Sequence, residues 1–118
     1  MNRYLDFFEP DNLHAMKESL KRAFEWGARK AIVIGPNPCG VELANILRKI
    51  GISWIERQLT TFRKPDIADA DLVLVTGGHG TDVSRVLHDC FDRNIAAIAP
   101  ITEHHCSKRT VFLLSIPK

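Results

Sequence analysis

Five of the chain's seven glycines occur in two short segments, GPNPCG at 35–40 and GGHGT at 77–81. Each segment follows an apolar run and precedes a run with helical spacing. The first amides of a helix have no partner inside the helix and carry partial positive charge, so such junctions attract anions. We call them the first and second glycine segments. Together they predict a binding site for a phosphate-bearing small molecule.

The residues predicted to contact this ligand are Gly35, Asn37 and Gly40 in the first glycine segment and Gly77, Gly78, His79, Gly80 and Thr81 in the second. Asn37 either contacts the ligand or restricts the site to a smaller one. Thr81 is expected to cap the following helix or to offer its hydroxyl. Against an anion stands Asp82, whose structural role would be to favour its own helix dipole. A valine at Gly78 is expected to block the ligand while leaving the fold intact.

A third segment, 100–106, is followed by two basic residues, Lys108 and Arg109, which are predicted to supply positive charge to the ligand. The segment also contains residue types that ligate zinc, namely Glu103, His104, His105 and Cys106. Adjacent residues seldom point to one centre, and no second pair of ligands with suitable spacing follows. No metal site is therefore predicted, and these four residues are the candidates if a metal binds.

Two residues of the glycine segments are candidates for catalysis. A thiolate at Cys39 would be stabilised beside a helix amino terminus, and His79 could act as a general acid or base. No nucleophile and base are placed together by motif spacing. Whether the protein is an enzyme is therefore left open, and the glycines and prolines could instead serve only to shape tight turns.

Helices are expected over 10–27, 40–51 and 81–94, and strands over 30–34, 52–56, 71–76, 95–99 and 109–115. Because strands alternate with helices, the strands should be mostly parallel, with right-handed crossovers. The expected fold is a single α/β domain over 1–118, with three layers and a five-stranded sheet. With these five strands numbered along the chain, the favoured order is 2-1-3-4-5. The connection before the fifth strand is short, so that strand could form an antiparallel edge.

Residues 30–57 resemble the dinucleotide-binding fingerprint of the Rossmann superfamily, particularly its flavoprotein branch. Gly35 and Gly40 match its first and third glycines, and Asn37 departs from its middle glycine. By this resemblance Glu56 would accept hydrogen bonds from a ribose, and the cofactor would be a nucleotide or dinucleotide. The second glycine segment is similar to the GGxGT loop of the lysine decarboxylase-like phosphoribohydrolases. Their full catalytic signature is absent, so no activity follows from that similarity.

Composition narrows the classes of partner. A formal net charge of +2 is too small to indicate nucleic acid or an anionic membrane as partner, and no apolar run approaches the roughly 18 residues of a membrane span. The acidic residues near the amino end do not suit an export signal. Three scattered cysteines suit a reducing cytoplasm. Homodimerisation is expected through a sheet edge near 110–115 or through the amino-terminal helix.

These observations leave four hypotheses for function. The favoured one is a binding domain for a nucleotide or another phosphate-bearing small molecule. The alternatives are a small enzyme acting on such a ligand with His79 as acid or base, a metal-handling protein using the zinc-ligating residues of 103–106, and a partner-binding module whose glycine segments have lost their ligand.

Overall fold

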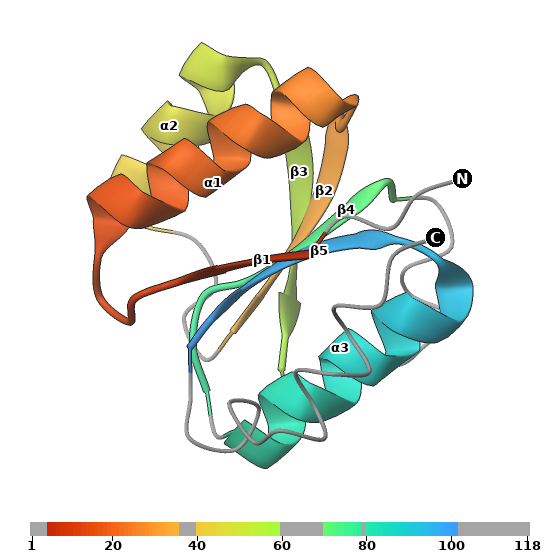
Figure 1. The fold of residues 1–118 in the computed structure, drawn as a ribbon. Coiled ribbons are helices and arrows are strands. Elements are labelled where there is room, and N and C mark those ends of the chain that lie inside the picture. Colours follow the sequence, from red (N-terminus) through yellow and green to blue (C-terminus); the bar gives the residue numbers. More distant parts are fainter. Residues whose placement is uncertain (1–4, 36–39, 60–69, 79, 102–118) are drawn as a thin grey trace.

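The computed structural model describes residues 5–35, 40–59, 70–78 and 80–101. The strands are β1 (Leu5–Phe8), β2 (Lys30–Gly35), β3 (Ser53–Gln58), β4 (Leu72–Val75) and β5 (Ala96–Pro100), and the helices are α1 (Leu13–Trp26), α2 (Val41–Ile50) and α3 (Gly80–Arg93). The five strands form one sheet in the order β1-β5-β4-β2-β3, and every neighbouring pair is parallel. Helices α1 and α2 cover one face and α3 covers the other (Figure 1). The three layers expected from the sequence are confirmed.

The order of four expected strands is correct, since β3, β2, β4 and β5 correspond to 52–56, 30–34, 71–76 and 95–99. The prediction that 109–115 lies beside 95–99 in the sheet is wrong. The position beside β5 is occupied by β1, which pairs in parallel from Leu5 with Ala97 to Phe8 with Pro100. No antiparallel edge occurs among the described strands, and 109–115 lies outside the described residues. The order therefore also differs from the 3-2-1-4-5 order of the classical Rossmann domain, although the parallel α/β sheet is consistent with a Rossmann-like fold.

The short strand β1 was missed because four residues that include a charged aspartate carry little strand periodicity. Tertiary contacts hold it in place. The side chain of Asp6 accepts hydrogen bonds from Nε and Nη2 of Arg22 on α1, at 3.0 and 2.6 Å. The Ile101 amide also donates to the carbonyl oxygen of Phe8 at 2.9 Å. An aspartate that looked unfavourable for a strand therefore links that strand to the helix that follows it.

Alternate residues of the central strands divide the core between the two sheet faces. In β4 all four residues are buried. Leu72 and Leu74 join the cluster beneath α1 and α2, whereas Val73 and Val75 join the cluster beneath α3. A continuous apolar strand buried on both faces is typical of a parallel sheet covered by helices. Strands β2 and β4 therefore form the buried centre of the sheet, from which the two glycine segments depart.

The carboxylate of Asp71 links the amino end of β2 to the amino end of β4. Asp71 accepts hydrogen bonds from the backbone amides of Arg29, at 3.1 Å, and Lys30, at 2.9 Å. The Asp71 amide donates in return to the carbonyl oxygen of Lys30 at 3.0 Å. These bonds fix the register in which Ala31 pairs with Leu72 and Ile34 with Val75. The same register determines how the carboxyl ends of the two strands meet.

Helix α1 begins after a polar residue, Asn12, and ends before a glycine, Gly27. The side-chain oxygen of Asn12 accepts the Ala15 amide at 3.0 Å, which caps the helix start. Gly27, expected as the stop, has φ +127° and donates its amide to the carbonyl oxygens of Ala23 and Phe24. Within the described residues, no helix has both the length and the apolar character that a membrane crossing requires.

Candidate functional site

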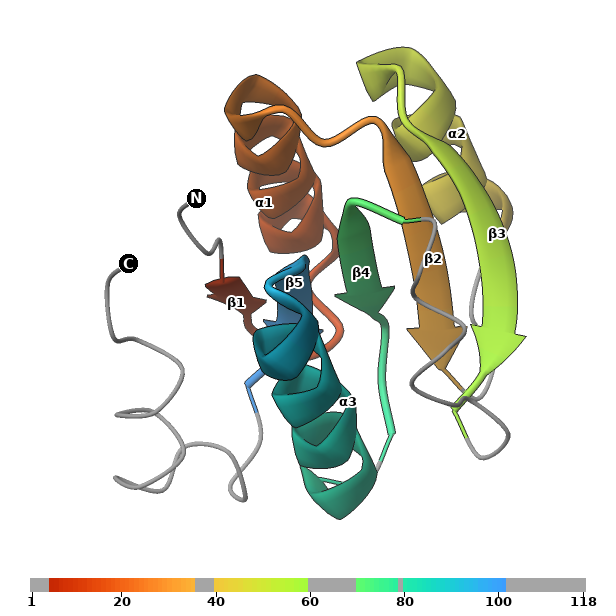
Figure 2. The ribbon, with the colours of Figure 1, turned by 90° about the vertical axis from the view of Figure 1, so that its right-hand side faces the viewer.

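The two glycine segments leave the sheet from adjacent strands. The first follows β2, whose connection through α2 leads to β3, and the second follows β4, whose connection through α3 leads to β5. The two connections therefore run toward opposite edges of the sheet and cover opposite faces (Figure 2). Ligands of open α/β sheets bind where the strand order reverses in this way. The strand ends from which the two segments leave therefore lie side by side at the same end of the sheet.

Direct contacts join the carboxyl ends of β2 and β4. The amide of Thr76 donates a 2.9 Å hydrogen bond to the carbonyl oxygen of Ile34, and the Thr76 hydroxyl donates to the same oxygen at 3.3 Å. A Cβ atom placed on Gly35 would overlap Oγ1 of Thr76 and lie 3.6 Å from the Gly77 nitrogen. A side chain at Gly35 would therefore require the Thr76 side chain to move, whether or not a ligand binds.

Gly78 also has a structural requirement. Its φ of +127° is a backbone conformation that residues with side chains rarely adopt, and a Cβ atom there would overlap Cδ2 of Leu59. Leu59 is buried in the cluster beneath α3. The expectation that Gly78→Val would leave the fold intact is therefore wrong, because valine would strain the backbone and displace a core side chain.

Gly40 and Gly77 have no such requirement. No described atom lies within 4 Å of a Cβ atom built on either residue. Gly40 has an extended backbone with φ −93° and ψ 177°, and φ of Gly77 is not positive. Residues with side chains adopt both conformations. These two glycines thus leave open space at the start of α2 and beside the carboxyl end of β4, although the described structure would accept a side chain at each.

Both helix starts carry an acidic residue in the first turn, Glu42 in α2 and Asp82 in α3. Each opposes a bound anion and favours its own helix dipole. Helix α3 begins at Gly80, one residue earlier than expected, so Thr81 lies inside the first turn. Of the two roles expected for Thr81, capping does not fit its place inside the helix, whereas its exposed side chain leaves the hydroxyl available to a ligand.

The carboxyl end of β3 extends further than expected. The strand continues to Gln58, which pairs with Gly35, whereas Glu56 pairs with Val33. Glu56 is therefore exposed on the edge strand two positions before the strand end, and Gln58 is level with the first glycine segment.

Two arginines lie near the carboxyl end of β3. Nη1 of Arg57 donates to the carbonyl oxygen of Glu56 at 2.8 Å, and Nη2 of Arg85 donates to that of Leu59 at 3.3 Å.

Sequence reasoning missed Thr76 and Gln58 as residues of this edge. The available signal for Thr76 was a hydroxyl residue directly between a buried strand and two glycines. Gln58 gave no comparable signal, because its position depends on the register of β3 against β2. The remaining expected site residues, Asn37, Cys39, His79, Glu103, His104, His105, Cys106, Lys108 and Arg109, lie outside the described residues.

Metal-ligating side chains do not gather in the part of the chain that the structure describes. No group of three or more histidine, cysteine, aspartate or glutamate residues there could hold a metal ion. Cys90 is buried in the cluster beneath α3, where it packs as a small core residue. Burial, with a further contribution from the negative charge of Asp89, raises the pKa of its thiol far above the ordinary value. A thiol held in its neutral form is a poor nucleophile.

Comparison with known proteins assigns no family to the chain. No protein-family model matches the sequence, and a search of curated proteins gave no match.

Proposed function

We propose that the edge formed by the carboxyl ends of β2 and β4 binds a nucleotide or another phosphate-bearing small molecule. The observation that carries the proposal is the adjacency of two glycine segments at the reversal of strand order, with Gly40 and Gly77 free of any packing requirement from the described atoms. Space beside the start of α2 and beside the carboxyl end of β4 suits a ligand that accepts hydrogen bonds from backbone amides.

The two helices contribute to one site from opposite faces of the sheet. Because β2 and β4 are hydrogen-bonded neighbours, their carboxyl ends are separated by about 4.8 Å. Helices α2 and α3 start on opposite faces of the sheet from this edge (Figure 1), so a ligand that lies across the edge can interact with the first turn of either helix. Glu42 and Asp82 moderate the positive potential there, which favours a ligand whose uncharged part, such as a ribose or base, supplies further contacts.

The test is thermal unfolding in the presence of ATP, NAD, FAD or inorganic pyrophosphate. A compound present at about 100 times its dissociation constant should stabilise the protein by about 2.7 kcal/mol, which is a shift of several degrees in Tm. Gly77→Val should abolish the shift while leaving the Tm without ligand close to that of the parent, because its side chain projects into the open space.

Ser53→Val is the matched control. It adds a branched side chain at an exposed position at the amino end of β3. The proposed site lies at the other end of the strands, where their carboxyl ends are. Ser53→Val should retain the full ligand-induced shift. A panel in which no compound stabilises the parent, or in which Gly77→Val responds as the parent does, would contradict the proposal.

A further inference from the structure

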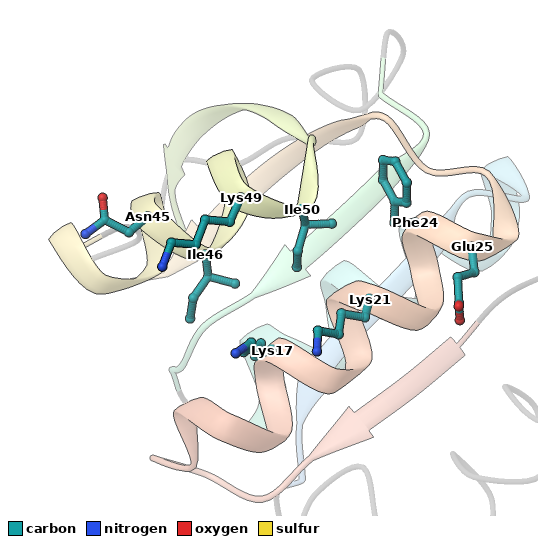
Figure 3. Close-up of a pocket in the computed structure, with 8 residues that line it drawn as sticks. All are labelled: Lys17, Lys21, Phe24, Glu25, Asn45, Ile46, Lys49 and Ile50. Carbon is teal, nitrogen blue, oxygen red and sulfur yellow. The ribbon is translucent and has the colours of Figure 1, made fainter.

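A groove of about 420 Å³ lies between α1 and α2, on the face of the sheet opposite α3. Its apolar part consists of Phe24 on α1 and Ile46 and Ile50 on α2, and its basic part of Lys17 and Lys21 on α1 and Lys49 on α2 (Figure 3). The lining residues of α2 come from the middle and last turns of that helix. The groove is therefore separate from the first turn of α2 and from the site proposed at the glycine segments.

The apolar floor of the groove is already ordered. Phe24, Ile46 and Ile50 are partly buried and pack against the core cluster beneath the two helices. The guanidinium carbon of Arg29 lies 3.7 Å from the centroid of the Phe24 ring. A Cβ atom built on Gly51 would lie 3.3 Å from Cε1 of the same ring. The ring is thus held between an arginine and the backbone that follows α2, and an apolar side chain could pack on this floor without rearranging it.

Three ammonium groups surround this floor. Lys17 and Lys21 are one helical turn apart on α1, and Lys49 projects from α2 on the other side. Neither Lys17 nor Lys49 forms an ion pair with any residue in the described part of the chain. Lys21 pairs only with exposed Glu18, at 3.4 Å, and such surface pairs contribute little. Against three lysines, the lining contains one carboxylate, that of Glu25.

We propose that this groove is a docking site for an acidic amphipathic helix of a partner protein. Such a helix would place apolar side chains against Phe24, Ile46 and Ile50, as in other helix-in-groove complexes. Carboxylates one turn apart on its edges would then pair with Lys17 and Lys21 on one side and Lys49 on the other. An anionic membrane would also attract the lysines, but a flat surface does not fill a recess between two helices.

The test uses a fluorescent synthetic peptide of about 18 residues, roughly 27 Å long as a helix, with leucine on one face and glutamate on the other. Binding is measured by fluorescence anisotropy at about 0.1 M salt. We expect the double variant Lys17→Glu/Lys49→Glu to weaken binding at least about tenfold, because two attractions become repulsions. Ile46→Ser should also weaken binding, without any change in charge.

The matched control is Lys30→Glu/Arg93→Glu, which makes the same charge change at exposed residues outside the groove. It should alter the affinity less than about twofold, and circular dichroism should show that all variants remain folded. A peptide with lysine in place of each glutamate should not bind. Equal weakening by both double variants would show non-specific attraction and would overturn the proposal.

Three further outcomes would also overturn it. The first is no binding of the acidic peptide at about 1 mM. The second is groove-dependent binding to phosphatidylserine vesicles without binding of the peptide, which would make the partner a membrane. The third is groove-dependent self-association in sedimentation experiments, which would make the partner a second copy of this chain.

Discussion

Gly35 lies so close to Thr76 that a methyl group on the glycine would overlap the threonine hydroxyl. Gly35 ends β2 and Thr76 directly follows β4. The backbone amide and hydroxyl of Thr76 both donate to the carbonyl oxygen of Ile34. This contact fixes the relative position of the strand ends from which the two glycine segments leave. The geometry of the proposed ligand site therefore depends on it.

Gly35→Ala should destabilise the fold by about 1–3 kcal/mol, because the added methyl group overpacks the junction. Adding Thr76→Ala removes the overlapping oxygen and should recover part of that loss. Urea unfolding of the two single variants and the double variant measures the coupling, expected at about 0.5–3 kcal/mol for residues in contact. Additive effects would show that Gly35 and Thr76 do not meet as described.

Substitutions at the neighbouring glycines Gly77 and Gly78 should have opposite effects on stability. Gly77→Ala should stabilise the fold by about 0.4–1 kcal/mol, because alanine accepts this backbone and restricts the unfolded chain. Gly78→Ala should destabilise it by more than about 1 kcal/mol, because of its positive φ and the overlap with Leu59. Urea unfolding distinguishes the two variants. Destabilisation by Gly77→Ala would mean that Gly77, too, is required by the fold.

Neutralising the acid at the start of α3 should separate helix stability from anion affinity. Asp82→Asn should lower stability by about 0.3–1 kcal/mol, since the carboxylate favours the helix dipole. The same change should raise the affinity for a phosphate ligand about two- to fivefold, because a repelling charge is removed. Glu42→Gln should act in the same directions at α2. Calorimetric titration with the compound identified by thermal unfolding checks this, and unchanged or weaker binding in both variants would place the ligand elsewhere.

Cys90 should make stability depend on alkaline pH. Burial raises the pKa of its thiol above the ordinary value of 9.0, so the unfolded chain loses this proton before the folded chain does. The contribution is fully present below pH 9.0 and declines at higher pH, by up to about 1.4 kcal/mol per unit. Urea unfolding at several pH values should show the parent losing its advantage over Cys90→Ala above pH 9.0. A constant difference between the two proteins would contradict the burial of this thiol.

Sequence patterns alone predict the three helices, four of the five described strands and the order of those four strands. Apolar periodicity identified the elements, and the alternation of strand and helix allowed few arrangements of a parallel sheet. That arrangement places the carboxyl ends of 30–34 and 71–76 side by side. The adjacency of the strand ends from which the two glycine segments leave could therefore be predicted without coordinates.

Tertiary contacts show which glycines would clash if they carried a side chain. A Cβ atom built on Gly35 or Gly78 would overlap Thr76 or Leu59, whereas one built on Gly40 or Gly77 would have no described atom within 4 Å. The strand β1 at the sheet edge and the basic groove between α1 and α2 likewise depend on partners distant in the chain. Local periodicity reports which face of an element is apolar. It does not report which side chain of another element lies opposite, because that is set by sheet register and helix packing.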